Sequence, residues 1–327
     1  MWRSRLAWFY LAVVALAWAL GEWGAEASVP TLLLAYLPPV VWLLPAPLVL
    51  CWTLIRRDGR RRGWATAVLA SALAAWGAGL LHSAFAPAPA TSAAALRVVT
   101  FNTARGTRIA PDKMAANLRA MNADVLMLQE TRFMDSDYRA ALVAGLPDYA
   151  LHSAGEVMTL ISLKQSRLPV LKTQVFAAPG SNRQYLQTTL GWRGQRLRVV
   201  NVHLNTVLLS RALAGDWDSV GRTRDVRNQQ VGLLEQIAAA ESGPLLLAGD
   251  LNTPPRGRLY RRLIRAYGPD AHDQAGRGPG WTFPSLYLRI DHALARGLQP
   301  VRVQVLPDAG SDHLPLLVEY ALTQTGE

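Results

Sequence analysis

The sequence contains a single cysteine, Cys51, among its 327 residues. One cysteine excludes an intrachain disulfide and a metal site built from cysteines, and it leaves the cellular compartment open. Acidic residues are also scarce at the start of the chain, where residues 1–86 contain only Glu22, Glu26 and Asp58. We find no internal repeat. The chain is longer than one average domain, and its uneven composition indicates one large domain with an appendage.

Lysine contributes little of the net charge of +11, nearly all of which comes from arginine. Residues 87–327 hold 27 Lys and Arg against 20 Asp and Glu, so this larger part is basic by itself. Arginine is suited to bidentate contacts with phosphate. Moderate positive charge favours anionic partners in general and identifies none of them.

Three long apolar stretches dominate residues 1–86, which also contain eight of the eleven Trp. They run over Leu6–Leu20, Val29–Ile55 and Trp64–Phe85, and each approaches or exceeds the ~20 residues that a helix needs to cross a bilayer. Burying all three in a soluble protein would need a very large core. We therefore predict a transmembrane region at 1–86, with helices near 6–21, 31–55 and 64–85.

Two of these stretches have alternatives. The segment Ala25-Glu26-Ala27 resembles a small-residue cleavage site, so the first stretch could be a signal peptide. The second stretch contains four prolines that must kink it or break it into a re-entrant form: Pro38, Pro39, Pro45 and Pro47.

Arginines predict how the chain is oriented in the membrane. Residues 56–62 contain five of them, and Arg3 and Arg5 precede the first stretch, so both segments are expected in the cytoplasm. Three crossings then place the rest of the chain, after the third stretch, outside the cytoplasm in a multi-pass membrane protein. Cleavage of a signal peptide leaves this result unchanged, whereas a re-entrant second stretch reverses it.

A linker of small residues and prolines at 87–95 separates this region from a chain of different character. Strands are predicted at 96–103, 123–129, 185–191, 197–203, 245–250, 287–295, 301–306 and 314–320, and helices at 112–121, 136–146, 223–240 and 259–266. Adjacent strands without crossover helices indicate antiparallel pairs within an α/β or α+β fold.

Polar residues stand at the ends of several of these strands. The apolar run 245–249 ends in Asp250 and Asn252, which project to the same side of a strand because they are two residues apart. Taken singly, each such residue is more often a turn or structural residue. Their conjunction in one chain favours a hydrolytic site; the set is Asn102, Glu130, His203, Asp250, Asn252, Asp291, Asp312 and His313.

These motifs resemble the endonuclease/exonuclease/phosphatase family, which includes pancreatic deoxyribonuclease, inositol polyphosphate 5-phosphatases and neutral sphingomyelinases. The matching elements occur in the family's order: Thr100-Phe-Asn102, Leu128-Gln-Glu130, Asn201-Val-His-Leu204, Gly249-Asp-Leu-Asn252, Arg289-Ile-Asp-His292 and Ser311-Asp-His313. The resemblance implies that residues 96–323 form a catalytic domain. It also implies a four-layer sandwich of two mixed β-sheets flanked by helices, and metal-dependent phosphoester hydrolysis.

The resemblance assigns a role to each residue. Glu130 would hold Mg²⁺ or Mn²⁺, with Asn102 as a second ligand and Asp312 as a further metal or loop residue; hard cations prefer such oxygen ligands. His313 would be the general base on the attacking water, oriented by Asp291. Asp250 would align that water, and the phosphoryl oxygens would be bound by Asn252 and His203.

The substrate is less defined. Abasic-site endonucleases have a second metal-binding acid where this chain has Ala104, which argues against that repair role. Two loops are expected to select the substrate: residues 204–227, which are rich in arginine, and residues 278–284, which carry Trp281 and Phe283. We predict a membrane-anchored phosphodiesterase of nuclease type with nucleic acid as substrate. The alternatives are a sphingomyelinase-like phosphodiesterase acting on phospholipid in the bilayer, a phosphatase, and an inactive domain that binds phosphorylated ligands.

Overall fold

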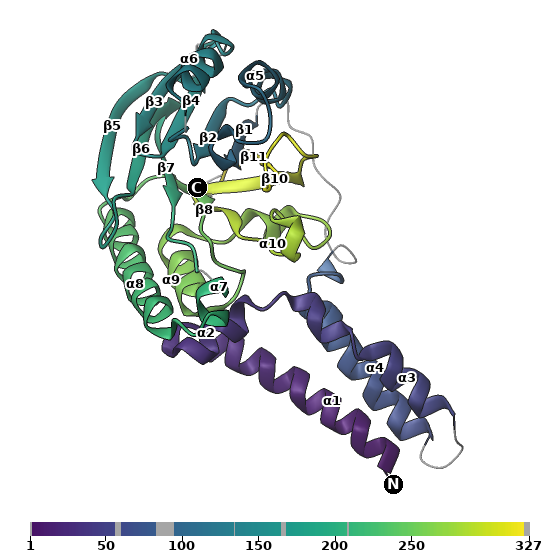
Figure 1. Ribbon diagram of the computed structural model, residues 1–327. Helices are drawn as coiled ribbons and strands as arrows, with labels where there is room; N and C mark the ends of the chain where they lie inside the picture. The colour runs from purple at the N-terminus through teal and green to yellow at the C-terminus, as the bar shows by residue number, and fades with distance from the viewer. Residues whose placement is uncertain are drawn as a thin grey trace.

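The computed structural model describes residues 2–55, 60–82, 95–133, 135–164, 168–207 and 209–323. Most of the predicted linker, residues 87–94, and part of the arginine-rich loop, residues 56–59, lie outside this set. Figure 1 shows an α/β domain from which a bundle of N-terminal helices projects.

The α/β domain contains two mixed β-sheets. The first has the strand order β10-β11-β1-β2-β4-β3 and is built from β1 (Leu96–Asn102), β2 (Val125–Gln129), β3 (Tyr149–Ala154), β4 (Val157–Ser162), β10 (Leu298–Val305) and β11 (Leu316–Leu322). The second has the order β5-β6-β7-β8-β9 and is built from β5 (Val170–Ala177), β6 (Gln184–Trp192), β7 (Gln195–His203), β8 (Leu245–Asp250) and β9 (Asp291–Arg296). Among the strands of the described residues, β1 with β2 and β7 with β8 pair in parallel, and the other neighbours pair antiparallel.

The two sheets pack face to face. Their shared core joins side chains of the first sheet, such as Val98 and Met127, to side chains of the second, such as Val199 and Leu246. Helices α5 (Pro111–Ala120) and α6 (Ser136–Ala144) flank the first sheet, and α8 (Trp217–Ala239) and α9 (Gly257–Tyr267) flank the second (Figure 1). Two mixed sheets flanked by helices were predicted, and this prediction is confirmed.

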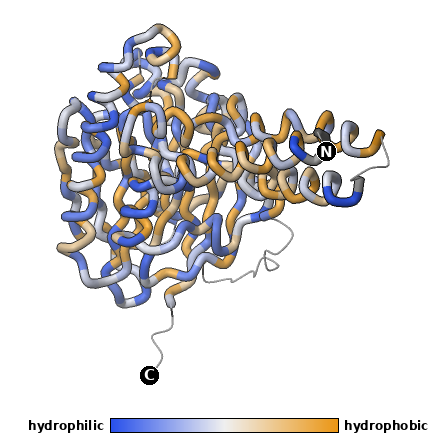
Figure 2. The backbone as a smooth tube through the Cα atoms, turned by 90° about the horizontal axis from the view of Figure 1, so that it is seen from below, coloured by the Kyte–Doolittle hydropathy of each residue, from blue (hydrophilic) through white to orange (hydrophobic). Residues whose placement is uncertain are grey.

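The projecting bundle consists of α1 (Trp2–Ala19), α3 (Ala46–Leu54) and α4 (Arg60–Gly77). Small and apolar residues of all three helices form its core, which includes Ala7, Val14, Val49 and Ala70. Apolar residues run along the helices of the bundle, as the orange segments of Figure 2 show, and several of their side chains are exposed. Among these, Phe9 is 67% and Leu48 76% accessible. A soluble domain rarely exposes so much apolar surface without a partner or a membrane.

The number of membrane spans differs from the prediction of three. By length and composition, one helical segment could cross a membrane, Arg5–Ala27, and a second candidate is the pair 29–36 and 39–54, bent by 78°. The bend falls at Pro38 and Pro39, which cannot continue a helix. Helix α4 begins with three arginines and ends at Gly77, so its uncharged part is too short to qualify.

Between the bundle and the domain lies α2 (Val29–Tyr36), preceded by the short turns η1 (Leu20–Gly24) and η2 (Ala25–Ala27) and followed by η3 (Pro39–Leu43). Helix α2 packs against the catalytic domain, where Leu32 and Ala35 contact Val207 and Val220. The N-terminal part is thus attached to the domain through its own hydrophobic core.

Candidate active site

The strand ends of both sheets meet at one edge of the sandwich. Asn102 ends β1, His203 ends β7 and Asp250 ends β8, while Asp291 begins β9. Within the second sheet, Asp250 pairs with His203 on one side and with Asp291 on the other. All four residues are buried, with at most 1% of their surface accessible. Strands β7 and β9, which pair with β8 on either side, therefore bring His203, Asp250 and Asp291 into one row.

Backbone geometry explains part of the local sequence. At Gly249, φ is +150°, and a Cβ would lie 1.9 Å from the carbonyl oxygen of Val202, so no other residue fits. Glu130 and Asn252 follow their strands with φ of 53° and 45°. The left-handed region is costly for residues other than glycine and persists only where the surroundings enforce it, commonly at functional sites.

His313 lies between two carboxylates. Its Nδ1 is 2.8 Å from Asp291 Oδ2, and its Nε2 is 3.8 Å from Asp250 Oδ2. Burial acts to lower the pKa of His313, but the charges of Asp291 and Asp250 outweigh it and raise the pKa to about 10. The ring of Phe283 packs against the imidazole at 4.9 Å between centroids. With both carboxylates ionised His313 is therefore protonated, and it can accept a proton only when their charge is offset.

The two aspartates are affected in opposite directions. Burial acts to raise the pKa of Asp250, but the charges of His313 and His203 lower it further than burial raises it. For Asp291, burial raises the pKa and His313 offsets this only in part, while the charge of Asp250 adds to the increase. Environments that separate the pKa values of neighbouring acids are typical of acid–base sites.

Asn102 lies between Glu130 and Asp250 and bonds to both carboxylates. Its Nδ2 donates to Asp250 Oδ2 at 2.9 Å and to Glu130 Oε1 at 3.3 Å, while its Oδ1 accepts from the backbone N–H of Ala104 at 3.0 Å. The amide nitrogen thus faces the carboxylates. Asn102 could ligate a cation beside Glu130 only after its amide group turned over.

His203 is surrounded by carboxylates. Its Nε2 lies 3.5 Å from Asp250 Oδ2 and 3.9 Å from Glu130 Oε1, and its Nδ1 lies 2.9 Å from Glu156 Oε1. Glu156 in turn forms an ion pair with Arg183 at 2.6 Å. Burial raises the pKa of Glu156, but His203 and then Arg183 lower it below its ordinary value. The sequence analysis missed Glu156, which stands in a turn between β3 and β4 without any motif.

Asn252 and Asp312 have different surroundings. The Asn252 side chain donates to the carbonyl of Leu204 at 3.1 Å, so one of its two amide hydrogens stays available. Asp312 is half-exposed and lies 3.7 Å from Arg108. Its neighbour Ser311 donates to the carbonyl of Asn102 at 2.7 Å, which fixes the last motif against β1.

The donor atoms suit a hard divalent cation. Within the described ranges, one compact group of potential ligands is formed by Asp250, Asp291 and His313, whose ligand atoms lie within 4.8 Å of one another. Asp291 Oδ1 is buried without a hydrogen-bond partner, as expected for a ligand atom. The predicted ligand Glu130 lies next to this group through Asn102. Carboxylate-rich sites of this kind favour Mg²⁺ or Mn²⁺.

The two predicted substrate loops differ in what they present. Arg227, at the end of the first loop, is completely buried and donates to oxygens of Asn205, Tyr36 and Thr253, so it does not lie on the surface that this loop was expected to present to a substrate. Trp281 packs edge-on against Tyr287 with 4.9 Å between ring centroids. Of the two aromatic residues in the second loop, Phe283 alone is in contact with the cluster, through His313.

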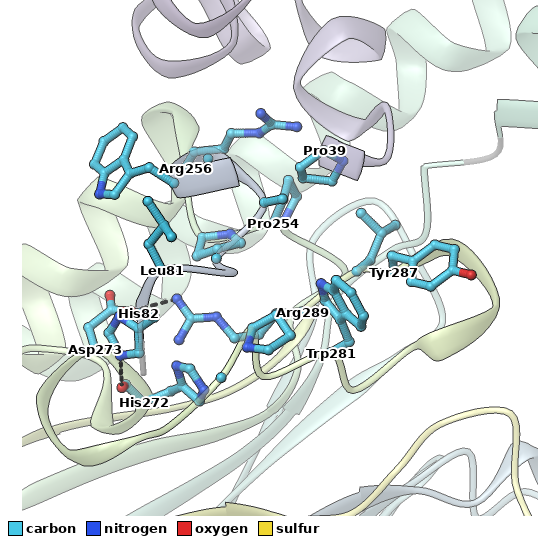
Figure 3. Close-up of a pocket in the computed structure, with 18 of the residues that line it drawn as sticks. Pro39, Leu81, His82, Pro254, Arg256, His272, Asp273, Trp281, Tyr287 and Arg289 are labelled. Atoms are coloured by element: carbon cyan, nitrogen blue, oxygen red, sulfur yellow. Dashed lines mark hydrogen bonds and ion pairs between the residues drawn. The ribbon is translucent and has the colours of Figure 1, made fainter. Parts of the chain in front are cut away.

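A cavity of about 580 Å³ lies between the bundle and the domain, beside the second of these loops (Figure 3). Its walls include Trp18 and Trp76 from the bundle and Arg256, Trp281 and Arg289 from the domain. None of the clustered site residues lines it. The cavity is therefore a feature of the junction and separate from the candidate active site.

A sandwich of two mixed sheets, with carboxylates, histidines and amides at converging strand ends, defines a phosphoester hydrolase fold. Residues 99–313 match the model of the Endonuclease/Exonuclease/phosphatase family, which is more than half of the chain. The chain belongs to this family.

Curated relatives that match this chain bear names that state no activity. The UPF0294 protein YE0917 of Yersinia enterocolitica is 28% identical over 210 residues, which cover 61% of this chain and 74% of the relative. A UPF0294 protein of Yersinia pseudotuberculosis is 26% identical over 260 residues, covering 71% of this chain and 86% of the relative.

Solved structures share the fold at low identity. A humanized TDP2 of D. rerio has a TM-score of 0.54 at 17% identity, covering 70% of this chain and all of that one. The catalytic domain of human Nocturnin has a TM-score of 0.53 at 16% identity, covering 72% and 97%. The mannosyl-6-phosphatase Bt3783 of Bacteroides thetaiotaomicron has a TM-score of 0.53 at 15% identity, covering 69% and 100%. At such identities the likeness concerns the fold alone.

Proposed function

We propose that this protein is a membrane-anchored, divalent-metal-dependent phosphodiesterase of nuclease type. The observation that carries the proposal is the meeting of His313, Asp291, Asp250, Asn102 and Glu130 at one edge of the sandwich. An Asp–His pair beside a second carboxylate and an amide supplies an oriented proton acceptor and a place for a water molecule.

In the proposed reaction, His313 takes a proton from the attacking water, and Asp291 holds its imidazole through Nδ1. Asp250 aligns the water, since its Oδ2 is near both His313 and His203. The free amide hydrogen of Asn252 and the ring of His203 would bind the phosphoryl oxygens.

Glu130 would hold the cation, together with Asn102 after reorientation of its amide and with Asp312 or the Asp250–Asp291 pair as further ligands. When bound, the cation would polarise the phosphoryl group and offset the carboxylate charge that raises the pKa of His313.

Nucleic acid is the proposed substrate. The arginine-rich balance of residues 87–327 supports it, and so does a structural neighbour, a TDP2 of D. rerio that is described in complex with a single-strand DNA product. The second candidate is a phosphatase, favoured by the likeness to mannosyl-6-phosphatase. The purified full chain, assayed with Mg²⁺ or Mn²⁺ against single-stranded DNA, RNA, phospholipid and sugar phosphates, separates these candidates. Hydrolysis of none of them would refute the proposed activity.

The bundle is the proposed membrane anchor. Its exposed apolar side chains support this role, and α1 alone extends over about 27 Å, close to the thickness of a bilayer core. The start of α1, the end of α3 and the start of α4 lie at the tip that points away from the catalytic domain (Figure 1). Arginines therefore gather at one end of the bundle, and the domain lies at the other.

This arrangement supports an extracytoplasmic catalytic domain, because basic ends remain in the cytoplasm. A phosphatase reporter that is active only outside the cytoplasm, fused after the last residue, tests the orientation. Activity of the reporter is the expected result. A stable fusion without reporter activity would place the domain in the cytoplasm.

A further inference from the structure

Tyr36, at the end of α2, reaches the candidate active site from the N-terminal part of the chain. The side chain is 5% accessible, and its hydroxyl donates to the carbonyl of Asn252 at 2.7 Å. These two residues are 216 positions apart in the sequence. A residue outside the family's matched segment thus touches the loop that carries a predicted phosphate-binding residue.

Arg227 completes the contact. Its Nη2 donates to the hydroxyl of Tyr36 at 2.6 Å and to Thr253 Oγ1 at 2.5 Å, and its Nη1 donates to the carbonyl of Asn205. No carboxylate of the described residues forms an ion pair with this fully buried guanidinium. A buried cation must find acceptors, and Tyr36 supplies one of them. Arg227 consequently joins the loops that follow β7 and β8 to helix α2.

The hydroxyl of Tyr36 is suited to this double role. Burial raises the pKa of Tyr36 to about 12, although Arg227 acts to lower it. The phenol therefore keeps its proton at neutral pH, and it can accept from Arg227 while it donates to Asn252.

Asn252 needs such support because its backbone is in the left-handed region. Its N–H donates to Asp250 Oδ1 at 2.8 Å, its side chain donates to Leu204, and its carbonyl accepts from Tyr36. Two of these three restraints come from the second sheet and the loop after β7. The third comes from the N-terminal part.

Further contacts keep α2 in place. Arg256 donates to the carbonyls of Ala35 at 2.8 Å and Leu37 at 3.1 Å, on either side of Tyr36. Glu26 accepts from the backbone N–H of Arg258 at 2.9 Å. The segment 22–37 is thus bonded along the start of the loop and helix that follow Asn252.

We infer that the N-terminal segment completes the catalytic centre, with Tyr36 as a positioning residue for Asn252. The inference rests on the proposed phosphoester hydrolysis. It gives the segment a second task beside attachment to a membrane, namely to hold the loop after β8 in its strained, active shape.

The test compares Tyr36→Phe with Tyr10→Phe in the full-length protein. Tyr10 is a matched control, because it is also 5% accessible and also donates to a backbone carbonyl, that of Trp42, at 2.7 Å. Its contact lies within the bundle. Tyr10→Phe removes one hydrogen bond, whereas Tyr36→Phe removes two, one of which comes from the buried Arg227. Tyr36→Phe should therefore lose more thermal stability than Tyr10→Phe, and the comparison rests on kcat and KM.

Only Tyr36→Phe should reduce kcat, by about tenfold, with KM changed less than twofold. Unchanged kcat in folded Tyr36→Phe, or an equal loss in Tyr10→Phe, would overturn the inference. If Tyr36→Phe fails to fold, Thr253→Val removes an acceptor of the same Arg227 and should lower kcat in the same way; unchanged kcat there would also overturn it. A wild-type protein without hydrolytic activity would instead refute the proposed function.

Discussion

Asp291→Asn separates the catalytic contribution of the Asp–His pair from its contribution to stability. The amide keeps the shape of the side chain and removes the charge that holds Nδ1 of His313 at 2.8 Å. Loss of correctly oriented general base catalysis typically lowers kcat by ~10²- to 10⁴-fold. Burial raises the pKa of Asp291 and the charge of Asp250 adds to this, while His313 offsets it only in part, so the fold favours the ionised carboxylate less than at Asp270. Asp291→Asn should therefore lower Tm less than Asp270→Asn does.

Asp270→Asn is the matched control, because Asp270 forms a second buried Asp–His pair, with His292 at 2.6 Å. Burial acts to raise the pKa of Asp270, but Arg289 and His292 hold it well below the ordinary value. Its ionised form hence stabilises the fold at neutral pH, and removal of one partner of such a buried pair costs about 3 to 5 kcal/mol. Asp270→Asn should lower Tm and retain most of kcat.

The assay measures kcat on a phosphodiester and Tm by calorimetry for both variants. Asp291→Asn should lose its activity with the smaller loss of Tm, and Asp270→Asn should keep its activity with the larger loss of Tm. If kcat and Tm fell in the same proportion in both variants, the distinction between a catalytic and a structural Asp–His pair would be refuted.

The remaining predictions concern single steps of the proposed reaction and the acid stability of the fold. His313→Ala and Asp250→Asn should each lower kcat ~10²- to 10⁴-fold without unfolding the domain, and wild-type kcat in a folded variant would remove that residue from the reaction. Glu130→Gln should raise the Mg²⁺ concentration needed for half-maximal activity, because it removes a charged oxygen ligand; an unchanged metal titration would point to Asp312. Burial lowers the pKa of His272 to about 3, with the charge of Arg289 adding to the effect. Below about pH 6.5 the unfolded chain binds a proton at His272 that the folded chain does not bind, so the free energy of unfolding should fall as the pH drops toward 3. Urea unfolding at several pH values measures this dependence. His272→Gln should make the free energy of unfolding depend less on pH, and an unchanged dependence would contradict the prediction.

Much of the site could be predicted because strand ends are visible in the sequence. Apolar runs that stop at Asn102, His203 and Asp250 predicted three residues that the structure brings together. Pairing of β8 with β9 then places Asp291 opposite Asp250, as the motif order suggested. His292, the next residue of that motif, is buried and bonded to Asp270 instead.

Other contacts could not be predicted, since they depend on which distant segments fold together. Glu156 stands in a turn without any pattern, and only the fold brings it to His203. Arg227 looked like a loop arginine, whereas α8 carries it into the interior beside Tyr36. No local signal in an apolar N-terminal helix indicates that one of its tyrosines bonds to a loop more than two hundred residues away.

The expected three spans failed for a local reason. Hydropathy summed over long stretches ignores where a helix must stop. In the structure, Pro38 and Pro39 divide the second stretch, and the third ends as a helix at Gly77. The bundle still brings α1, α3 and α4 side by side, so the segments were correctly identified as helical and their lengths were not.

The most direct test of the central claim is metal-dependent hydrolysis of single-stranded DNA by the purified full-length protein, measured for the wild type and for His313→Ala in parallel. The account predicts turnover by the wild type with Mg²⁺ or Mn²⁺, its loss on chelation with EDTA, and at least a hundredfold lower rate in the variant. DNA cleavage that is equal in the two proteins, or that persists undiminished in EDTA, would contradict it.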